Sequence, residues 1–280
     1  MSASAAAELA SGKGHRDENF PVASLLVKPQ HRAPIMAFYR FARAADDIAD
    51  HPAATPTQKL ERLEAMRAGL LGESEGEPAA VALRSAIATR GLGPTHALDL
   101  LEAFRRDVTK RRYADWDELI DYCRVSAMPV GRFVLDVHGE ARDTWPASDA
   151  LCAALQIINH LQDCGKDYRA LDRVYLPQDL LHEAGVPTEA LGAARSTPAL
   201  RSTITTLAGR CEKLLGECAA FSRSVADRRL AAEVAIIRRL ALSLAKRLQR
   251  RDPLSETVHH GKMETFLLAA GAAIGSLVRR

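Results

Sequence analysis

Two aspartate pairs with the same spacing constrain the fold of this chain more than any other feature. Asp46 and Asp50 form the first pair, and Asp163 and Asp167 form the second. A separation of four residues places both side chains on one helix face, so two such helices packed antiparallel can present four carboxylates to a shared cleft. Carboxylates without cysteine or spaced histidine ligands suit Mg²⁺, whose coordination is usually completed by substrate phosphate oxygens. The spacing therefore predicts a magnesium site between two helices.

The alternative for such a pair is an ordinary solvated helix face, which is the usual meaning of an isolated pair. Here Asp50 precedes His51 and Pro52, and Gly165 interrupts the second pair. Both clusters are therefore expected near helix C-termini, where negative charge opposes the helix dipole. The same unfavourable placement, found twice, favours a functional site.

The rest of the chain predicts an all-α fold. Ala, Leu and Arg are abundant, and Pro or Gly falls between segments rather than inside alternating patterns, so strands have almost no support. Residues 1–17, of which the first ten are rich in Ala and Ser, are expected to be disordered, and residues 18–280 to form one domain. Helices are expected over residues 31–51, 57–71, 77–90, 94–110, 115–140, 147–168, 186–193, 198–225, 227–250 and 259–278.

Composition excludes several classes of protein. The 38 basic and 35 acidic side chains give a formal charge of +3, too small to predict a nucleic-acid partner. The five scattered cysteines contain no CxxC pair, and the N-terminus lacks the apolar core of a signal peptide, so we expect reduced thiols in a cytoplasmic protein. The longest apolar run, residues 266–278, is too short to span a bilayer and predicts either a core helix or an interfacial one. The sequence does not indicate an oligomeric state.

The first motif helix carries a polar stripe beside core-like apolar positions. At 100° per residue its members fall within about 60° of arc. If the helix is buried all round, the stripe faces an interior cavity. The members are Tyr39, Arg43, Asp46 and Asp50.

The second motif helix repeats this arrangement with Gln156 and Asn159 ahead of its aspartates. Buried amides need partners, and an interhelical hydrogen bond or a bound ligand could equally supply them. After the helix, Arg173 could bind a phosphate with two hydrogen bonds and Tyr175 could donate to an oxygen.

Together these motifs resemble the squalene and phytoene synthase family. Residues 39–50 resemble its first aspartate signature, and residues 156–167 with residues 173–177 resemble the second, in the same order and separation. Residues 18–24, 37–43 and 251–254 resemble, more narrowly, the bacterial hydroxysqualene synthases of hopanoid biosynthesis. The resemblance covers nearly the whole chain and implies a single-domain isoprenoid-synthase-type helical bundle with a central cavity.

For activity, the resemblance implies Mg²⁺-dependent conversion of presqualene diphosphate and water to hydroxysqualene and diphosphate. The substrate would be an isoprenoid diphosphate, and the greasy product suggests peripheral contact with the inner membrane face. One alternative is head-to-head condensation of farnesyl diphosphate to presqualene diphosphate, squalene or dehydrosqualene, and the aspartates cannot separate these reactions. A second alternative is a non-catalytic assembly protein with the family fold, against which the four retained aspartates argue. Use of NADPH is left open.

The resemblance also implies roles for individual residues. Asp46, Asp50, Asp163 and Asp167 would hold Mg²⁺, and these four together with Tyr39 and Asn159 would form the catalytic set. Substrate would contact Phe20, Arg43, Val125, Met128, Gln156, Lys166, Arg173, Tyr175 and Lys262. Two positions depart from the pattern: Met128 stands where the hydroxysqualene branch commonly has Asn, and Thr257 stands where the family often has Arg.

Overall fold

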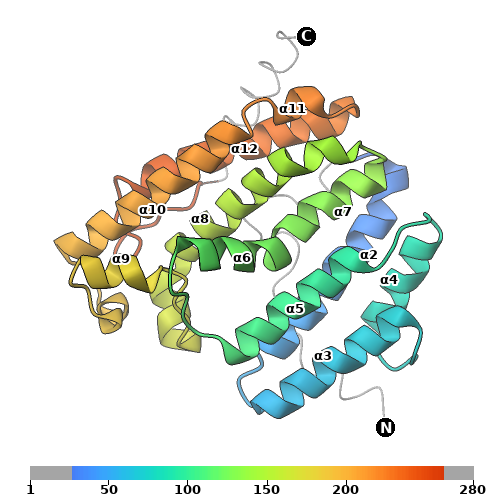
Figure 1. Cartoon of the computed structure of the whole chain (residues 1–280), viewed down its shortest axis with the longest axis horizontal. Coiled ribbons are helices and arrows are strands. Elements are labelled where there is room, and N and C mark those ends of the chain that lie inside the picture. The colour runs from blue at the N-terminus through green and yellow to red at the C-terminus, as the bar shows by residue number, and fades with distance from the viewer. Residues whose placement is uncertain (1–26, 262–280) are drawn as a thin grey trace. The chain divides into compact units, whose positions relative to one another are not determined.

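The computed structural model describes residues 27–261 (Figure 1). The chain divides into two compact units. The first unit runs to Lys110 and includes Arg132–Gly139, and the second contains Arg111–Gly131 and the chain from Glu140 onward. Apart from one isolated bridge between Arg112 and Val174, the described residues form no β-structure. The all-α prediction is therefore confirmed, whereas a single domain over residues 18–280 stays a prediction. The segment 1–17 lies outside the described residues.

Four helices of the first unit pack around one apolar core. They are α2 (Pro29–Ala49), α3 (Pro56–Leu71), α4 (Pro78–Ala88) and α5 (Thr95–Thr109). The first three begin with proline, whose fixed φ suits the first turn and whose missing N–H costs no helical hydrogen bond there. The core side chains with no exposed surface include Phe41, Ala45, Leu63, Met66 and Leu83.

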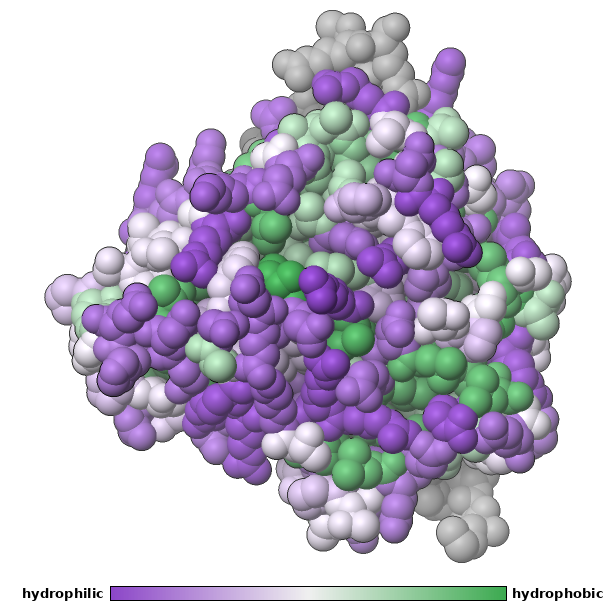
Figure 2. All heavy atoms as spheres, in the orientation of Figure 1, coloured by the Kyte–Doolittle hydropathy of each residue, from purple (hydrophilic) through white to green (hydrophobic). Residues whose placement is uncertain are grey.

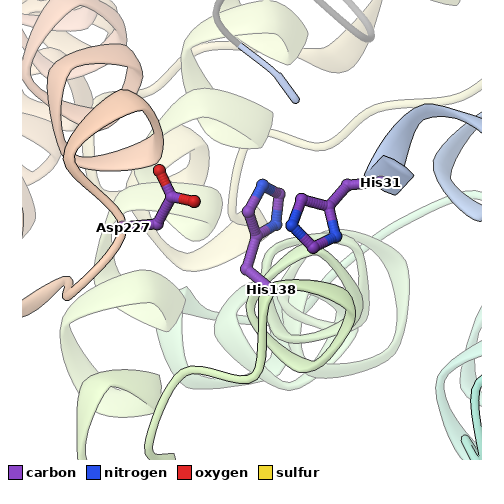
Figure 3. Close-up of side chains that lie close together, drawn as sticks. All are labelled: His31, His138 and Asp227. Atoms are coloured by element: carbon purple, nitrogen blue, oxygen red, sulfur yellow. The ribbon is translucent and has the colours of Figure 1, made fainter. Parts of the chain in front are cut away.

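Ring contacts attach the second half of α7 (Met128–His138) to the first unit. Phe133 stacks on Phe38 with ring centroids 4.0 Å apart. The rings of His138 and His31 lie side by side at 4.2 Å (Figure 3). Such pairs bury large apolar surfaces in a defined geometry, so they fix how this segment packs against α2.

In the second unit, α8 (Trp145–Leu171) packs against α6 (Trp116–Ser126), α10 (Pro198–Glu217) and α12 (Arg228–Leu248). Shorter elements complete it: α9 (Gln178–Glu183), α11 (Phe221–Ser224) and two 3₁₀ turns, Arg142–Thr144 and Thr188–Gly192. Its core includes the fully buried side chains Ile158, Ile204, Leu207, Ala241 and Leu248.

The helix predicted over residues 115–140 is wrong as one element, because it divides into α6 and α7 at Ala127. A residue two positions before Pro129 can end one helix, and the proline then occupies the first turn of the next, where it needs no N–H donor. Gly131 permits close packing of this turn on α8, since a methyl group there would lie 2.6 Å from Sγ of Cys152.

Other boundaries differ from the prediction. The segment 198–225 contains α10 and the separate α11, and residues 186–193 hold only a 3₁₀ turn. Of the segment 259–278, only His259 to Gly261 are described, and they are not helical. In the part of the chain that the structure covers, no helix is both long and apolar enough to cross a bilayer. Hydrophilic side chains predominate on the face drawn in Figure 2.

Candidate active site

The first aspartate pair lies at the end of α2. Asp46 is in the last turn, and the N–H of Asp50, the residue that ends the helix, donates to the Asp46 carbonyl oxygen at 2.9 Å. Tyr39 and Arg43 lie earlier on the same helix and are partly buried. The predicted position at a helix C-terminus is confirmed for this pair.

Arg43 holds two of the carboxylates on this helix. Its Nη1 donates to Oδ2 of Asp46 at 2.8 Å, and its Nη2 donates to Oδ1 of Asp47 at 2.6 Å. Charge-assisted bonds of this kind orient both partners. Arg43 therefore sets the direction of the Asp46 carboxylate, a function that the sequence did not indicate.

The Asp46 carboxyl group is unusually basic. Its pKa is raised to about 7, first by burial and then by the negative charges of Asp50, Asp107 and Asp47, while the positive charge of Arg43 opposes the rise. The side chain nevertheless keeps 38% of its surface exposed, so solvent and ions can reach it. Excess negative potential at an accessible carboxylate fits a site that gains a cation.

Asp107 is a functional candidate that the sequence reasoning missed. It lies on α5 with its side chain almost buried, at the spacing of the apolar residues Leu100 and Ala103. A carboxylate on the buried stripe of an amphipathic helix is costly unless a partner or a bound cation compensates its charge. That break in the stripe was the available signal.

The second aspartate pair lies on α8, which continues to Leu171, three residues beyond its predicted end. Asp167 is thus in the last turns of the helix and Asp163 one turn earlier, and both are partly buried. Lys166 is exposed. The pairs belong to different units, so the cleft that would join them stays a prediction.

Gly165 serves packing within this motif. A methyl group at its Cα would lie 2.6 Å from Cδ2 of Leu254 and 3.2 Å from the carbonyl oxygen of Leu191. The glycine therefore lets α8 approach two neighbouring segments closely, which explains a helix-weakening residue between the aspartates.

Gln156 contacts a histidine that sequence reasoning also missed. The Gln156 Nε2 lies 2.9 Å from Nε2 of His160, and the opposite ring nitrogen of His160 lies 3.9 Å from Oδ2 of Asp167. These contacts form a row along one face of α8, from Gln156 through His160 to Asp167. Asn159 is partly buried on the same helix.

Arg173 and Tyr175 lie in a buried segment that pairs with the chain before α6. The N–H of Val174 donates to the Arg111 carbonyl oxygen at 2.9 Å. The Tyr175 ring stacks on His160 at 3.4 Å and on Tyr113 at 5.5 Å. Because the ring is used in packing, a substrate contact by Tyr175 would come from its hydroxyl group.

The remaining predicted residues occupy different surroundings. Val125 is partly buried in the last turn of α6, and Met128 is buried at the start of α7. Both side chains are apolar and carry no hydrogen-bond donor. Phe20 and Lys262 lie outside the described residues.

Comparison with known proteins decides the family. The squalene/phytoene synthase family model matches residues 14–264. This chain belongs to the squalene/phytoene synthase family. It is an enzyme of the squalene/phytoene synthase type, and it has the helical fold of that family.

Among relatives of this family, the hydroxysqualene synthase of Rhodopseudomonas palustris is 57% identical over 98% of this chain and 94% of its own length. The hydroxysqualene synthase of Sinorhizobium fredii is 54% identical over 95% of this chain and 91% of its own length. The crystal structure of a squalene synthase from Alicyclobacillus acidocaldarius has a TM-score of 0.74 at 34% identity, covering 88% of this chain and 92% of that one.

Proposed function

We propose that this enzyme converts presqualene diphosphate and water into hydroxysqualene and diphosphate with Mg²⁺ as cofactor. The observation that carries the proposal is identity of 54–57% to proteins named hydroxysqualene synthase, over nine tenths or more of both chains. The phytoene synthase of Thermus thermophilus, by contrast, is 30% identical over 92% of this chain.

The donor set of the two aspartate pairs fits a hard cation. Asp46, Asp50, Asp163 and Asp167 offer carboxylate oxygens, the ligands that Mg²⁺ prefers. A cation there would offset the burial and the repulsion from Asp50 that together raise the pKa of Asp46 to about 7. When bound, Mg²⁺ would neutralise the negative charge that develops on the departing diphosphate.

Several cations of the chain are proposed to hold the diphosphate. Arg43 keeps Asp46 and Asp47 oriented and could share its guanidinium with a phosphate oxygen. Lys166 is exposed beside Asp167, and Arg173 follows the same helix. Lys262 completes the proposed set.

Apolar walls are proposed to protect the cation that remains after diphosphate departs. Val125 and Met128 supply side chains that cannot attack it, which limits premature capture by water. Tyr39 and Asn159, one to two turns before the aspartates of their helices, are the proposed polar groups beside the reacting carbon.

A second candidate is head-to-head condensation of farnesyl diphosphate. It is favoured by the TM-score of 0.74 to a structure described as a squalene synthase. The two reactions differ in substrate, and only condensation that ends in squalene needs a reductant, so product analysis with each substrate separates them.

The test supplies purified enzyme and Mg²⁺ with presqualene diphosphate or farnesyl diphosphate, each with and without NADPH, and identifies products by mass spectrometry. We expect hydroxysqualene from presqualene diphosphate alone, independent of NADPH. Asp46→Asn and Asp163→Asn should abolish turnover with helical content intact, whereas the exposed Asp143→Asn should behave as wild type. Consumption of farnesyl diphosphate would favour the second candidate, and normal turnover by either motif variant would remove the metal assignment.

A further inference from the structure

His160 is a largely enclosed polar residue beside the second aspartate pair, and the proposed reaction gives it no role. It lies on α8 one turn after Gln156, and only 12% of its side chain is exposed. Ring nitrogens in such surroundings need hydrogen-bond partners, because an unpaired polar group is costly to bury. The partners of the two nitrogens therefore indicate what this histidine does.

Aromatic rings fix the plane of the His160 imidazole. It stacks on Tyr175 with centroids 3.4 Å apart and planes inclined by 15°, and the Tyr122 ring of α6 lies 6.1 Å away. Tyr175 is itself stacked on Tyr113 at 5.5 Å. All three tyrosines are buried, so tilting the imidazole would disturb a close-packed core. A ring confined to one plane presents its two nitrogens in defined directions.

Gln156 sets which ring nitrogen carries the proton. The Gln156 amide Nε2 lies 2.9 Å from Nε2 of His160, and an amide nitrogen can only donate. Nε2 of the ring must then accept, so the single proton of the neutral imidazole is on Nδ1. Nδ1 is also the atom that lies 3.9 Å from Oδ2 of Asp167. His160 thus offers this carboxylate an N–H donor without adding positive charge.

Asp167 can accept that hydrogen bond and still bind a cation. The separation of 3.9 Å is about 1 Å longer than a hydrogen bond, and such contacts often tighten only when the ligand is bound. The carboxylate has two oxygens, so Oδ2 can accept from His160 while Oδ1 remains for a metal ion. Within residues 27–261, no other side chain forms a hydrogen bond or ion pair with Asp167. His160 is therefore the side chain placed to orient it.

The first aspartate pair is oriented by a different kind of group. Arg43 donates to Asp46 at 2.8 Å and to Asp47 at 2.6 Å, and its positive charge competes with a metal ion for these carboxylates. A neutral imidazole N–H orients a carboxylate and leaves its negative charge to the metal. Carboxylates that bind metal ions are commonly held by hydrogen bonds of this kind.

We propose that His160 is a positioning residue that holds Asp167 in the direction in which it binds the divalent cation. This inference rests on the proposed function, in which Asp167 is a metal ligand. Gln156 and Tyr175 act on Asp167 through His160, the first by fixing the position of the ring proton and the second by fixing the ring plane. The role requires no change of protonation during the reaction.

The test measures binding of Mn²⁺, a paramagnetic substitute for Mg²⁺ that also prefers oxygen ligands, to the full chain without substrate by electron paramagnetic resonance. His160→Phe keeps a stacked ring and removes both nitrogens, so binding should be on the order of tenfold weaker. His160→Asn places an amide N–H near the position of Nδ1 and should recover most of the affinity. The control His182→Phe, at an exposed position on α9, should match wild type.

Two further measurements distinguish positioning from packing. In NMR spectra of enzyme with isotope-labelled histidines, the nitrogen resonances that His160→Phe removes belong to His160, and they should show the proton on Nδ1. In turnover of presqualene diphosphate, the Mg²⁺ concentration that gives half the maximal rate should rise in His160→Phe by the same factor as the Mn²⁺ dissociation constant. A ring that served packing alone would change the melting temperature and leave this metal dependence unaltered.

Asp167→Asn separates failure of this inference from failure of the metal site. If Asp167→Asn weakens Mn²⁺ binding and His160→Phe does not, the metal site stands and His160 has no part in it. If wild type binds no Mn²⁺, or Asp167→Asn binds it equally well, the metal assignment of Asp167 and this inference are both wrong. A proton on Nε2, or equal losses of affinity in His160→Asn and His160→Phe, would also overturn the positioning role.

Discussion

The imidazole ring of His160 stacks on the phenol ring of Tyr175, with centroids 3.4 Å apart and planes inclined by 15°. His160 lies on α8, between Gln156 and Asp167, and Tyr175 lies in the segment after the helix. The contact therefore ties the segment that carries Arg173 to the helix that carries the second aspartate pair.

The first prediction separates the ring of Tyr175 from its hydroxyl group. Tyr175→Ala should lower the free energy of unfolding by about 3–5 kcal/mol, because it deletes a buried aromatic ring. Tyr175→Phe keeps the ring and should cost little stability, yet raise KM if the hydroxyl group contacts substrate. Urea denaturation and steady-state kinetics measure the two effects. Wild-type kinetics for the Phe variant would remove Tyr175 from the substrate-binding set.

The second prediction concerns Arg43. Arg43→Ala should weaken binding of a diphosphate analogue at least about tenfold, since hydrogen bonds to charged groups contribute about 1.5–3 kcal/mol. Mg²⁺ affinity should not fall with it, because Asp46 and Asp47 lose a competing cation. Arg40→Ala, at an exposed position on the same helix, is the control. Affinities are measured by calorimetric titration. If both variants lose the same affinity for the diphosphate analogue, Arg43 contributes only to the general surface charge.

The third prediction is a pH dependence of the metal-free enzyme. Because the pKa of Asp46 is raised from 3.8 to about 7, the folded state holds this proton more tightly than the unfolded state does. The Asp46 contribution should therefore destabilise the metal-free fold as pH rises from about 4 to about 7. Melting temperatures in the presence of a chelator should show this fall for wild type and less of it for Asp46→Asn. If the melting temperatures of the two proteins fall equally with pH, Asp46 is not the group with the raised pKa.

The fourth prediction tests Asp252 as a structural anchor. Its carboxylate accepts hydrogen bonds from the N–H and hydroxyl of Ser196 at 2.9 and 2.6 Å, and from the N–H of Leu254 at 3.0 Å. Burial opposes ionisation, but these bonds outweigh it and lower the pKa of Asp252. Asp252→Ala should cost about 1–3 kcal/mol, because partly buried donors lose their charged acceptor.

The stabilisation by Asp252 has a defined pH window. A depressed pKa stabilises the fold above the unfolded value near 3.8, and this is lost as pH falls through the lower folded value. Wild type and Asp252→Ala should therefore converge in denaturation measurements at acidic pH. Asp143→Ala, at an exposed site, should match wild type throughout.

The fifth prediction compares two helical glycines. Gly165→Ala should destabilise the enzyme by about 1–3 kcal/mol, because the new methyl group meets Leu254 and the backbone of Leu191. Gly209→Ala, on α10, meets nothing within 4 Å and should stabilise by about 0.5–1 kcal/mol through helix propensity. Thermal unfolding of both variants checks the contrast. A stabilised Gly165→Ala would show that the neighbours of α8 yield easily.

Most helices were predictable because their apolar period and their proline and glycine boundaries are local. The placement of Asp46, Asp50, Asp163 and Asp167 near helix ends follows from the same local signals. The break between α6 and α7 could not be predicted, because Pro129 is compatible both with a kink inside one helix and with the first turn of a new helix.

Contacts between distant segments could not be predicted. Nothing in the spacing of Tyr113, Tyr122 and Tyr175 shows that their rings meet, because that depends on how residues 111–114 and 173–178 pair. The hydrogen bonds from Arg43 to Asp46 and Asp47 also could not be predicted, because they depend on side-chain rotamers that the sequence does not specify. Asp107 was detectable in principle from its place on a buried stripe.

Gly165 complicates any attempt to identify catalytic positions by mutational tolerance. A saturation library across residues 163–167 would find this glycine as intolerant as its flanking aspartates, although it offers no side chain to metal or substrate. Its intolerance would come from lack of space beside Leu254 and Leu191, and it would reduce the yield of folded enzyme. If the aspartates hold the metal as proposed, their substitution would instead reduce turnover per folded molecule. Only a screen that scores abundance and activity separately would distinguish the two causes.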